Sequence, residues 1–425
     1  MAAQGRLGRW SWLPLLIIAA AVWFCDQKAQ AQSYGVELHN TLMPASGGMG
    51  GTSIARPQDL LSALNGNPAA MSQFEGTQFC FSGAWADPTI KFRQEAALPI
   101  ANVTPYEATS ATPGIAAGNI GLTQNFNDWG KPVTIGVGLV STAGGGVDFR
   151  AVDESNGTSS ELLVLHVIGG MAVQLTDRLS LGATAALGEG FYDAPYAGVG
   201  AMAVAYGVRG SVGFNFEVTS DTTLGFYYQT AEQFVFRDAI RLAGPANTLS
   251  AAFDVPMGLP DNLGVGIANR SLMGGNLLLA VDVIFKEWDN ASLYRSVYHN
   301  QWVIQTGAQY SSGQCRYRLG YAYAENPLEP ITNVSVGGIP LPDLVPGANY
   351  LQAQLAVINQ HRLSGGIGVV DLLPGVNFDM FAGCMFHASQ ELDQTNVSVS
   401  SYFLGAGITW RFGAFSGMPT TTPHN

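Results

Sequence analysis

Ser401-Tyr402-Phe403-Leu404-Gly405-Ala406-Gly407-Ile408-Thr409-Trp410-Arg411-Phe412 is the stretch that decides the fold. Every second residue from Tyr402 to Phe412 is apolar, and both ends of this face are aromatic. The residues between them are small or polar, apart from Phe403. A period of two is typical of a β-strand. A strand with an aromatic-bounded apolar face and a polar opposite face is typical of the wall of a transmembrane β-barrel.

The composition agrees with a membrane protein that crosses with strands. Of the 425 residues, 12% are charged, 47% are hydrophobic and 52 are glycine. A soluble protein usually carries about 25% charged residues. After residue 25, every apolar run is shorter or more interrupted than the roughly 20 residues that a membrane-spanning helix needs. The net charge of −12 excludes nucleic acid as a partner, because nucleic-acid binding needs clustered Lys and Arg.

The N-terminus predicts export from the cytoplasm. Arg6 and Arg9 precede the apolar run Trp10–Cys25, and Ala29-Gln30-Ala31 matches a small-residue cleavage site. We therefore predict a cleaved signal peptide over residues 1–31 and a location in the bacterial outer membrane. Lipid attachment at Cys25 is the alternative, which the bulky Phe24 before it disfavours.

The chain divides by its pattern. Residues 32–75 are rich in Gly, Ala and Ser, with room for one short helix at Ala55–Leu64, and predict a small N-terminal element. Residues 76–412 alternate like strands, and residues 413–425 form a tail beyond the last aromatic. The runs are Thr77–Ala86, Gly114–Asn125, Val133–Thr142, Leu162–Leu175, Arg178–Gly190, Tyr206–Val218, Asp221–Thr230, Ala252–Asn269, Asn276–Ile284, Gln301–Tyr310, Cys315–Tyr323, either Leu351–Leu363 or His361–Val370, Val376–His387 and Ser401–Phe412. Fourteen antiparallel strands, with short turns alternating with long connections, predict a closed all-β transmembrane barrel.

No constellation of residues predicts an enzyme. The sequence has no Gly-x-Ser-x-Gly elbow and no close-spaced pair of His or Cys that would bind a metal. We therefore expect no catalytic residues, no metal and no cofactor. The one sharp motif is Asn67-Pro68-Ala69, which chemistry alone identifies as a turn, because the residue before a proline avoids the helical region.

Several motifs, in this order, resemble the FadL/TodX-type outer-membrane transporters of long-chain fatty acids and other hydrophobic molecules. Asn67-Pro68-Ala69 resembles the motif of the family's N-terminal hatch, Arg318–Pro327 resembles one of its strands, and His361–Gly368 resembles the next. The resemblance implies that residues 32–75 form a hatch inside the barrel and that the twelfth strand is His361–Val370. It also implies that Tyr34 and Val36 reach into a ligand pocket.

The resemblance further implies capture of a ligand outside, passage to an inner apolar pocket and sideways exit near the third strand, Val133–Val147. Gly144, Gly145 and Gly146 would supply a bend there, with an ordinary flexible loop as the alternative. The basic residues expected near a fatty-acid carboxylate are missing from Glu189–Tyr196, and Arg295 is the candidate substitute. A neutral or aromatic substrate therefore fits as well as a fatty acid.

These observations favour passive uptake of hydrophobic molecules through a hatch-gated barrel. The expected partners are a hydrophobic small molecule or fatty acid, the lipid of the outer membrane and the barrel-assembly machinery, and the expected state is a monomer. A general diffusion porin or an adhesin-like barrel is the alternative. The low charge and the Asn67 motif argue against an open porin.

Overall fold

The computed structural model of the protein describes residues 37, 39–127, 130–193, 202–243, 249–336 and 339–412. The predicted signal peptide, Tyr34, Val36 and the predicted tail at 413–425 lie outside the described residues.

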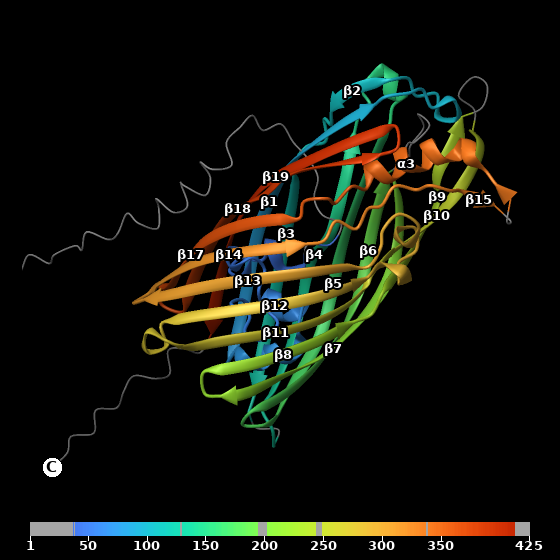
Figure 1. The fold of residues 1–425 in the computed structure, drawn as a ribbon. Helices are drawn as coiled ribbons and strands as arrows, with labels where there is room; N and C mark the ends of the chain where they lie inside the picture. Colours follow the sequence, from blue (N-terminus) through green and yellow to red (C-terminus); the bar gives the residue numbers. More distant parts are fainter. Residues whose placement is uncertain are drawn as a thin grey trace, which may run out of the picture.

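Fourteen antiparallel strands form a closed barrel, as the sequence predicted (Figure 1). The barrel closes where the first strand pairs with the last, Thr77 opposite Phe412. In order around the wall the strands are β1 (Thr77–Gln94), β3 (Ile115–Phe126), β4 (Val133–Asp148), β5 (Ser159–Thr176), β6 (Leu179–Asp193), β7 (Ala203–Thr219), β8 (Thr222–Gln229), β11 (Asp261–Leu272), β12 (Leu277–Glu287), β13 (Gln301–Ser312), β14 (Cys315–Ala324), β17 (His361–Leu373), β18 (Val376–Leu392) and β19 (Thr395–Phe412).

The last strand shows how the period of two builds the wall. Leu404 and Phe412 are each 57% exposed on the outside of β19, whereas Gly405 and Gly407 between them are buried. Phe403, which interrupts the polar face, also points inward, and its ring lies 6.2 Å from that of Phe381 on β18. These two rings therefore form an apolar contact on the inside of the wall.

The two ends of the barrel differ. Short turns join the strands at one end, here called the turn end, and longer connections join most of them at the other, the loop end (Figure 1). The connections carry further elements: β2 (Tyr106–Thr109), β9 (Glu232–Ala243), β10 (Leu249–Leu259), β15 (Ser335–Val336), β16 (Ile339–Pro340), α3 (Val345–Gln354), η4 (Pro99–Ala101), η5 (Asp153–Ser155), η7 (Met273–Gly275), η8 (Trp288–Asn290), η9 (Tyr294–Ser296) and η10 (Pro342–Leu344). No helix within the described ranges is long and apolar enough to cross a membrane.

Several strand predictions were wrong at the loop end. The alternative strand Leu351–Leu363 is one of them, since α3 ends at Gln354 and β17 begins at His361. The run Ala252–Asn269 is not one strand: β10 ends before Pro260 and pairs with β9, and β11 begins at Asp261. Proline has no backbone N–H, so the ladder with the neighbouring strand restarts after it. Residues 388–400, predicted as a long loop, instead extend β18 and β19 to a tight turn at Asp393, which adopts a left-handed conformation.

Residues 39–74, here called the inner segment, are largely buried and pack against the inside of the wall. The segment holds η1 (His39–Leu42), η2 (Ser46–Met49), α2 (Leu60–Asn65) and η3 (Pro68–Gln73). The carboxylate of Asp59 caps α2 by accepting from Ser62 N–H, and it also accepts from the N–H groups of Ala45 and Ser46. One side chain thus fixes the helix to the turn before it.

Glycines on the inward face of the strands make room for the inner segment. A Cβ added at any of them would meet an atom of residues 44–71. They are Gly121, Gly136, Gly138, Gly182, Gly213, Gly225, Gly264, Gly266, Gly307, Gly320, Gly366 and Gly407. Because these positions lie on strands all around the barrel, the segment fits against the wall on every side.

Candidate functional site: an apolar path and a buried ion pair

An apolar cavity of about 470 Å³ opens among the loop-end connections. It is lined by Tyr192 at the end of β6, by Val255 on β10, and by parts of η9 and α3. The remaining lining residues are Leu293, Ser296, Val297, Ile331, Asn333, Val334, Ser335, Ala348, Leu351 and Leu355. Its size and apolar lining suit a small hydrophobic molecule.

An aromatic cluster continues from this cavity into the barrel. Tyr192 and Val255 line the cavity and also belong to the cluster, which includes Ala143 and Val147 on β4. Its other aromatic members are Phe92, Tyr106, Phe149, Phe234, Phe236, Trp288, Tyr294, Tyr298 and Tyr350. The rings of Tyr192 and Phe236 lie 5.3 Å apart, and those of Trp288 and Tyr298 lie 4.9 Å apart. The apolar cluster therefore extends from the cavity to several wall strands, and β4 is one of them.

The wall is incomplete beside that strand. The ladder between β3 and β4 ends at Ile120 opposite Leu139, although both strands continue toward the loop end. A register shift between Ser141 and Ala143 places one extra residue, Thr142, in β4 where it pairs with β5. Such a bulge bends a strand and re-aims it.

Side chains bridge the two strands where the ladder has ended. The amide oxygen of Asn119 accepts from Ser141 N–H at 2.9 Å, and the Ser141 hydroxyl donates to the carbonyl of Gly118 at 3.1 Å. Backbone contact resumes higher up, where Ala111 N–H donates to the carbonyl of Asp148. The span between residues 112–119 and 140–147 is here called the wall gap.

The predicted glycine triplet lies next to this bulge. Gly144, Gly145 and Gly146 belong to β4 and pair in regular register with Leu163, Leu162 and Glu161 of β5. The alternative interpretation, a flexible loop, is therefore wrong. The register shift falls two residues before Gly144, so the irregular residue itself is Thr142.

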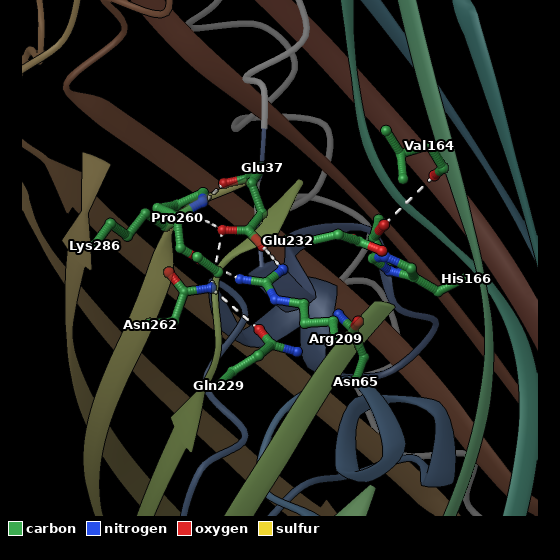
Figure 2. A network of polar contacts seen from close by, with 12 residues as sticks. Glu37, Asn65, Val164, His166, Arg209, Gln229, Glu232, Pro260, Asn262 and Lys286 are labelled. Atoms are coloured by element: carbon green, nitrogen blue, oxygen red, sulfur yellow. Dashed lines mark hydrogen bonds and ion pairs between the residues drawn. The ribbon is translucent and has the colours of Figure 1, made fainter. Parts of the chain in front are cut away.

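A buried ionic cluster, shown in Figure 2, adjoins the aromatic cluster, since Glu37 and Lys286 line the same small cavity as Trp288 and Tyr298. Arg209 of β7 donates from Nη1 to Glu37 Oε1 at 2.5 Å, and Lys286 of β12 donates from Nζ to Glu37 Oε2 at 2.9 Å. Asn262 donates to the same Oε2 at 3.0 Å. The side chains of Glu37, Arg209 and Lys286 are each 6% exposed or less.

Electrostatics keep Glu37 ionised despite its burial. Burial alone would raise the pKa of the Glu37 carboxyl, but the charges of Arg209 and Lys286 outweigh it and hold the pKa well below its ordinary value. Burial lowers the pKa of neighbouring His39 to about 3, and the Lys286 charge acts in the same direction. His39 is thus neutral, and its ring stacks on Tyr227 at 5.6 Å.

Asn67 ties the inner segment to the wall. Its side-chain nitrogen donates to the carbonyls of Ile54 and Phe214 and to the side-chain oxygen of Asn215. Its oxygen accepts from Ala69 N–H and so caps η3, in which Pro68 is the first residue. The Asn-Pro-Ala motif is thus more than a turn, because Asn67 also contacts β7.

Several residues of this arrangement were not predicted from the sequence. Arg295, the predicted carboxylate partner, is exposed on η9, and the next residue, Ser296, lines the cavity. Arg209 and Lys286 were missed, as were Asn119 and Ser141. The sequence did hold a signal for Lys286. It alternates with Asp282 and Ile284 on the inward face of its strand, and a charged residue on that face needs a partner inside the barrel.

The described part of the chain has no cluster of three or more His, Cys, Asp or Glu side chains that could hold a metal ion. Buried ionisable side chains near the aromatic cluster include Glu37, Arg209 and Lys286, which bind one another, and Glu232, which pairs with His166.

Solved structures share this fold. No protein-family model matches the sequence, and no curated protein does. The toluene transporter TodX of Pseudomonas putida is 17% identical, with 90% of this chain and 99% of that chain covered and a TM-score of 0.62. A FadL homologue of Pseudomonas aeruginosa is 15% identical over 90% and 99%, with a TM-score of 0.62. The toluene transporter TbuX of Ralstonia pickettii is 18% identical over 88% and 99%, with a TM-score of 0.61. The resemblance seen in the sequence motifs is thus confirmed at the level of the fold.

Proposed function

We propose that this chain, which has the fold of the FadL- and TodX-type barrels, takes up hydrophobic molecules passively across the outer membrane. Long-chain fatty acids and neutral or aromatic compounds are the candidate substrates. One observation carries the proposal: a cluster of packed apolar side chains extends from the loop-end cavity to Ala143 and Val147 of β4, at the wall gap. TodX and TbuX, whose folds are similar, are toluene transporters, which supports the same kind of substrate.

Capture needs no energy source. Moving an apolar molecule from water into the cavity is favourable by about 25 cal/mol for each Å² that it buries. The aromatic cluster offers further apolar contact, so the molecule advances without returning to water. The bilayer is the final apolar phase, and the wall gap is the nearest way into it.

We propose the wall gap as the lateral exit. Between residues 112–119 and 140–147 no ladder has to be broken for a molecule to pass, and the bonds of Asn119 and Ser141 close only its lower edge. The glycines Gly144, Gly145 and Gly146 keep the adjoining part of β4 free of side chains. These features support a sideways route over a route along the barrel axis.

The inner segment acts as a hatch in this proposal. It fills the barrel below the aromatic cluster and meets the glycines of the wall on all sides. A general diffusion porin needs an open, water-filled lumen. The packing of residues 39–74 therefore favours a gated transporter over the porin.

The test removes the bulge. Deleting Thr142 would let β4 continue in regular register, which we expect to narrow the wall gap and to lower uptake of labelled toluene or dodecane into cells by about tenfold or more, given how strongly geometry controls passage. The matched control deletes His387, the exposed residue at the bulge of β18, which lies away from the gap. Uptake that is unchanged by the Thr142 deletion would contradict the lateral route.

A further inference from the structure

Two buried cations of the barrel are already bound to a carboxylate of the chain itself. Arg209 and Lys286, here called the cation pair, both donate to the side chain of Glu37 (Figure 2). We infer that Glu37 occupies the place of a substrate carboxylate and thereby makes the protein selective for uncharged apolar molecules. This inference rests on the proposed function and narrows its substrate class.

The bonds of the cation pair are taken up by the protein. Besides Glu37, Arg209 donates from Nε to the carbonyl of Thr230 at 2.8 Å and from Nη2 to the carbonyl of Pro260 at 2.5 Å. Lys286 also donates to the backbone carbonyl of Glu37. Two backbone carbonyls from different connections thus hold the guanidinium in one orientation, with its remaining side facing the Glu37 carboxylate.

The carboxylate is also fully engaged. Its two oxygens accept from Arg209, Lys286 and Asn262, and Asn262 is held in turn by Gln229. Charge-assisted bonds of this kind are about twice as strong as neutral ones. A substrate carboxylate would have to replace all of them to gain the same partners.

Little room is left beside the ionic cluster. A cavity of about 10 Å³ adjoins it, lined by Glu37 and Lys286 below and by Trp288 and Tyr298 of the aromatic cluster. Arg362 also lines it. This space suits one water molecule and is too small for a carboxylate group. A carboxylate arriving through the aromatic cluster therefore reaches the cation pair only by displacing Glu37.

Glu37 has an advantage over a free carboxylate in binding the cation pair, because it belongs to the same chain. A group on the same chain acts at an effective concentration on the order of millimolar or above. A free carboxylate of similar intrinsic affinity, present at micromolar concentration, would then occupy the cation pair about a thousandfold less often. An uncharged apolar molecule does not compete for the cation pair and is bound by the aromatic cluster alone.

The experiment compares two probes with the same chain, 1-dodecanol and dodecanoate, both tritiated. Binding is measured to the purified full-length protein, whose folding is checked by its heat-dependent mobility on a gel. The wild type should bind dodecanol, and its affinity for dodecanoate should be lower by about tenfold or more. Glu37→Ala should strengthen dodecanoate binding about tenfold or more and change dodecanol binding less than about threefold, a tenfold change being about 1.4 kcal/mol.

Two further variants make the result specific. Glu37→Gln removes the charge but keeps the size of the side chain, so it should bind dodecanoate more strongly than the wild type and less strongly than Glu37→Ala. It replaces Glu37→Ala if that variant does not fold. Glu37→Gln with Lys286→Met removes one cation as well and should lose the gain. Glu107→Ala, at an exposed carboxylate of β2, should behave as the wild type.

The outcomes separate the two proposals. Equal binding of dodecanoate and dodecanol by the wild type, or no gain in either Glu37 variant, overturns the role of Glu37 and leaves hydrophobic uptake standing. Failure of every folded variant to bind either probe overturns the proposed function itself.

Discussion

At the scale of single residues, Asn67 does more than cap a short helix. Its side chain bonds to Ile54 of the inner segment and to Phe214 and Asn215 of β7. Asn67→Ala leaves these buried acceptors unpaired, which costs roughly 1–3 kcal/mol for each unsatisfied group. We expect the inner segment to be released more readily, seen as faster protease cleavage within residues 39–74.

The control for Asn67 is Asn269→Ala, which removes a side-chain bond to Thr222 between β11 and β8, at the turn end of the wall. It should leave cleavage of the inner segment at the wild-type rate. Equal cleavage of the Asn67 and Asn269 variants would show that Asn67 is only part of a turn, as its sequence alone suggests.

His39 gives the docking of the inner segment a dependence on pH. Its pKa is lowered from 6.5 to about 3 in the docked state. Between these values a released segment binds a proton and the docked one does not, so docking weakens as the pH falls from 6.5. Because the released state binds one more proton in this range, the equilibrium constant for docking should fall by about tenfold for each pH unit below 6.5.

Glu37 adds to this effect only in stronger acid. Because its pKa is lowered from 4.5, the stability that it contributes is present above that value and is lost as the pH falls below it. Protease cleavage of the inner segment between pH 7 and 4.5 should therefore rise in the wild type and stay nearly flat in His39→Gln. If cleavage of His39→Gln rises with falling pH as steeply as that of the wild type, another group is responsible for the pH dependence.

At the scale of elements, the match between the inner segment and the wall depends on glycine. A Cβ at Gly320 on β14 would meet backbone atoms of Met49 and Gly50, which cannot rotate away. We expect Gly320→Ala to destabilise docking by roughly 1–3 kcal/mol, as overpacking does elsewhere. The measurement is the midpoint of thermal release of the segment, read by protease cleavage.

Gly83 on β1 provides the matched control. It is also a strand glycine, but a Cβ there has no neighbour within 4 Å and the position is exposed. Gly83→Ala should leave the midpoint unchanged. A similar loss in both variants would mean that strand glycines matter for the strands themselves rather than for the segment.

The strands were predictable from sequence because a wall with lipid outside repeats its pattern every two residues. The prediction was wrong where a single residue decides the backbone. Pro260 separates β10 from β11, and Asp393 turns the chain between β18 and β19 without a glycine to mark it. The alternation of apolar and polar residues does not show that β10 pairs with β9 whereas β11 pairs with β8.

At the scale of the whole molecule, the site depends on residues that are distant in sequence. Glu37 and Arg209 are 172 positions apart, and Asn119 and Ser141 bond only because the ladder beside them has ended. No periodicity encodes such pairs. The Asn67-Pro68-Ala69 motif was found because its residues are contiguous, whereas the cation pair and the wall gap appear only when the barrel closes.

The inner segment should also block the axis of the barrel to ions. Removing residues 39–74 would leave a closed wall of fourteen strands with glycine on much of its inner face at the level of the segment. Water and ions would then enter from the turn end, and among the described residues the aromatic cluster would remain as an obstruction. We expect steady ion conductance in planar bilayers from the deletion variant and little from the wild type.

Deleting the connection at residues 232–257 is the control, since it removes β9 and most of β10 from the loop end and leaves the inner segment in place. This variant should conduct little, like the wild type. Large steady conductance from the wild type would favour a diffusion porin, and a silent but folded deletion of residues 39–74 would show that the aromatic cluster alone seals the barrel. Because the wall gap lies beside that cluster and above the segment, sideways uptake should survive the first deletion even as the axial path opens.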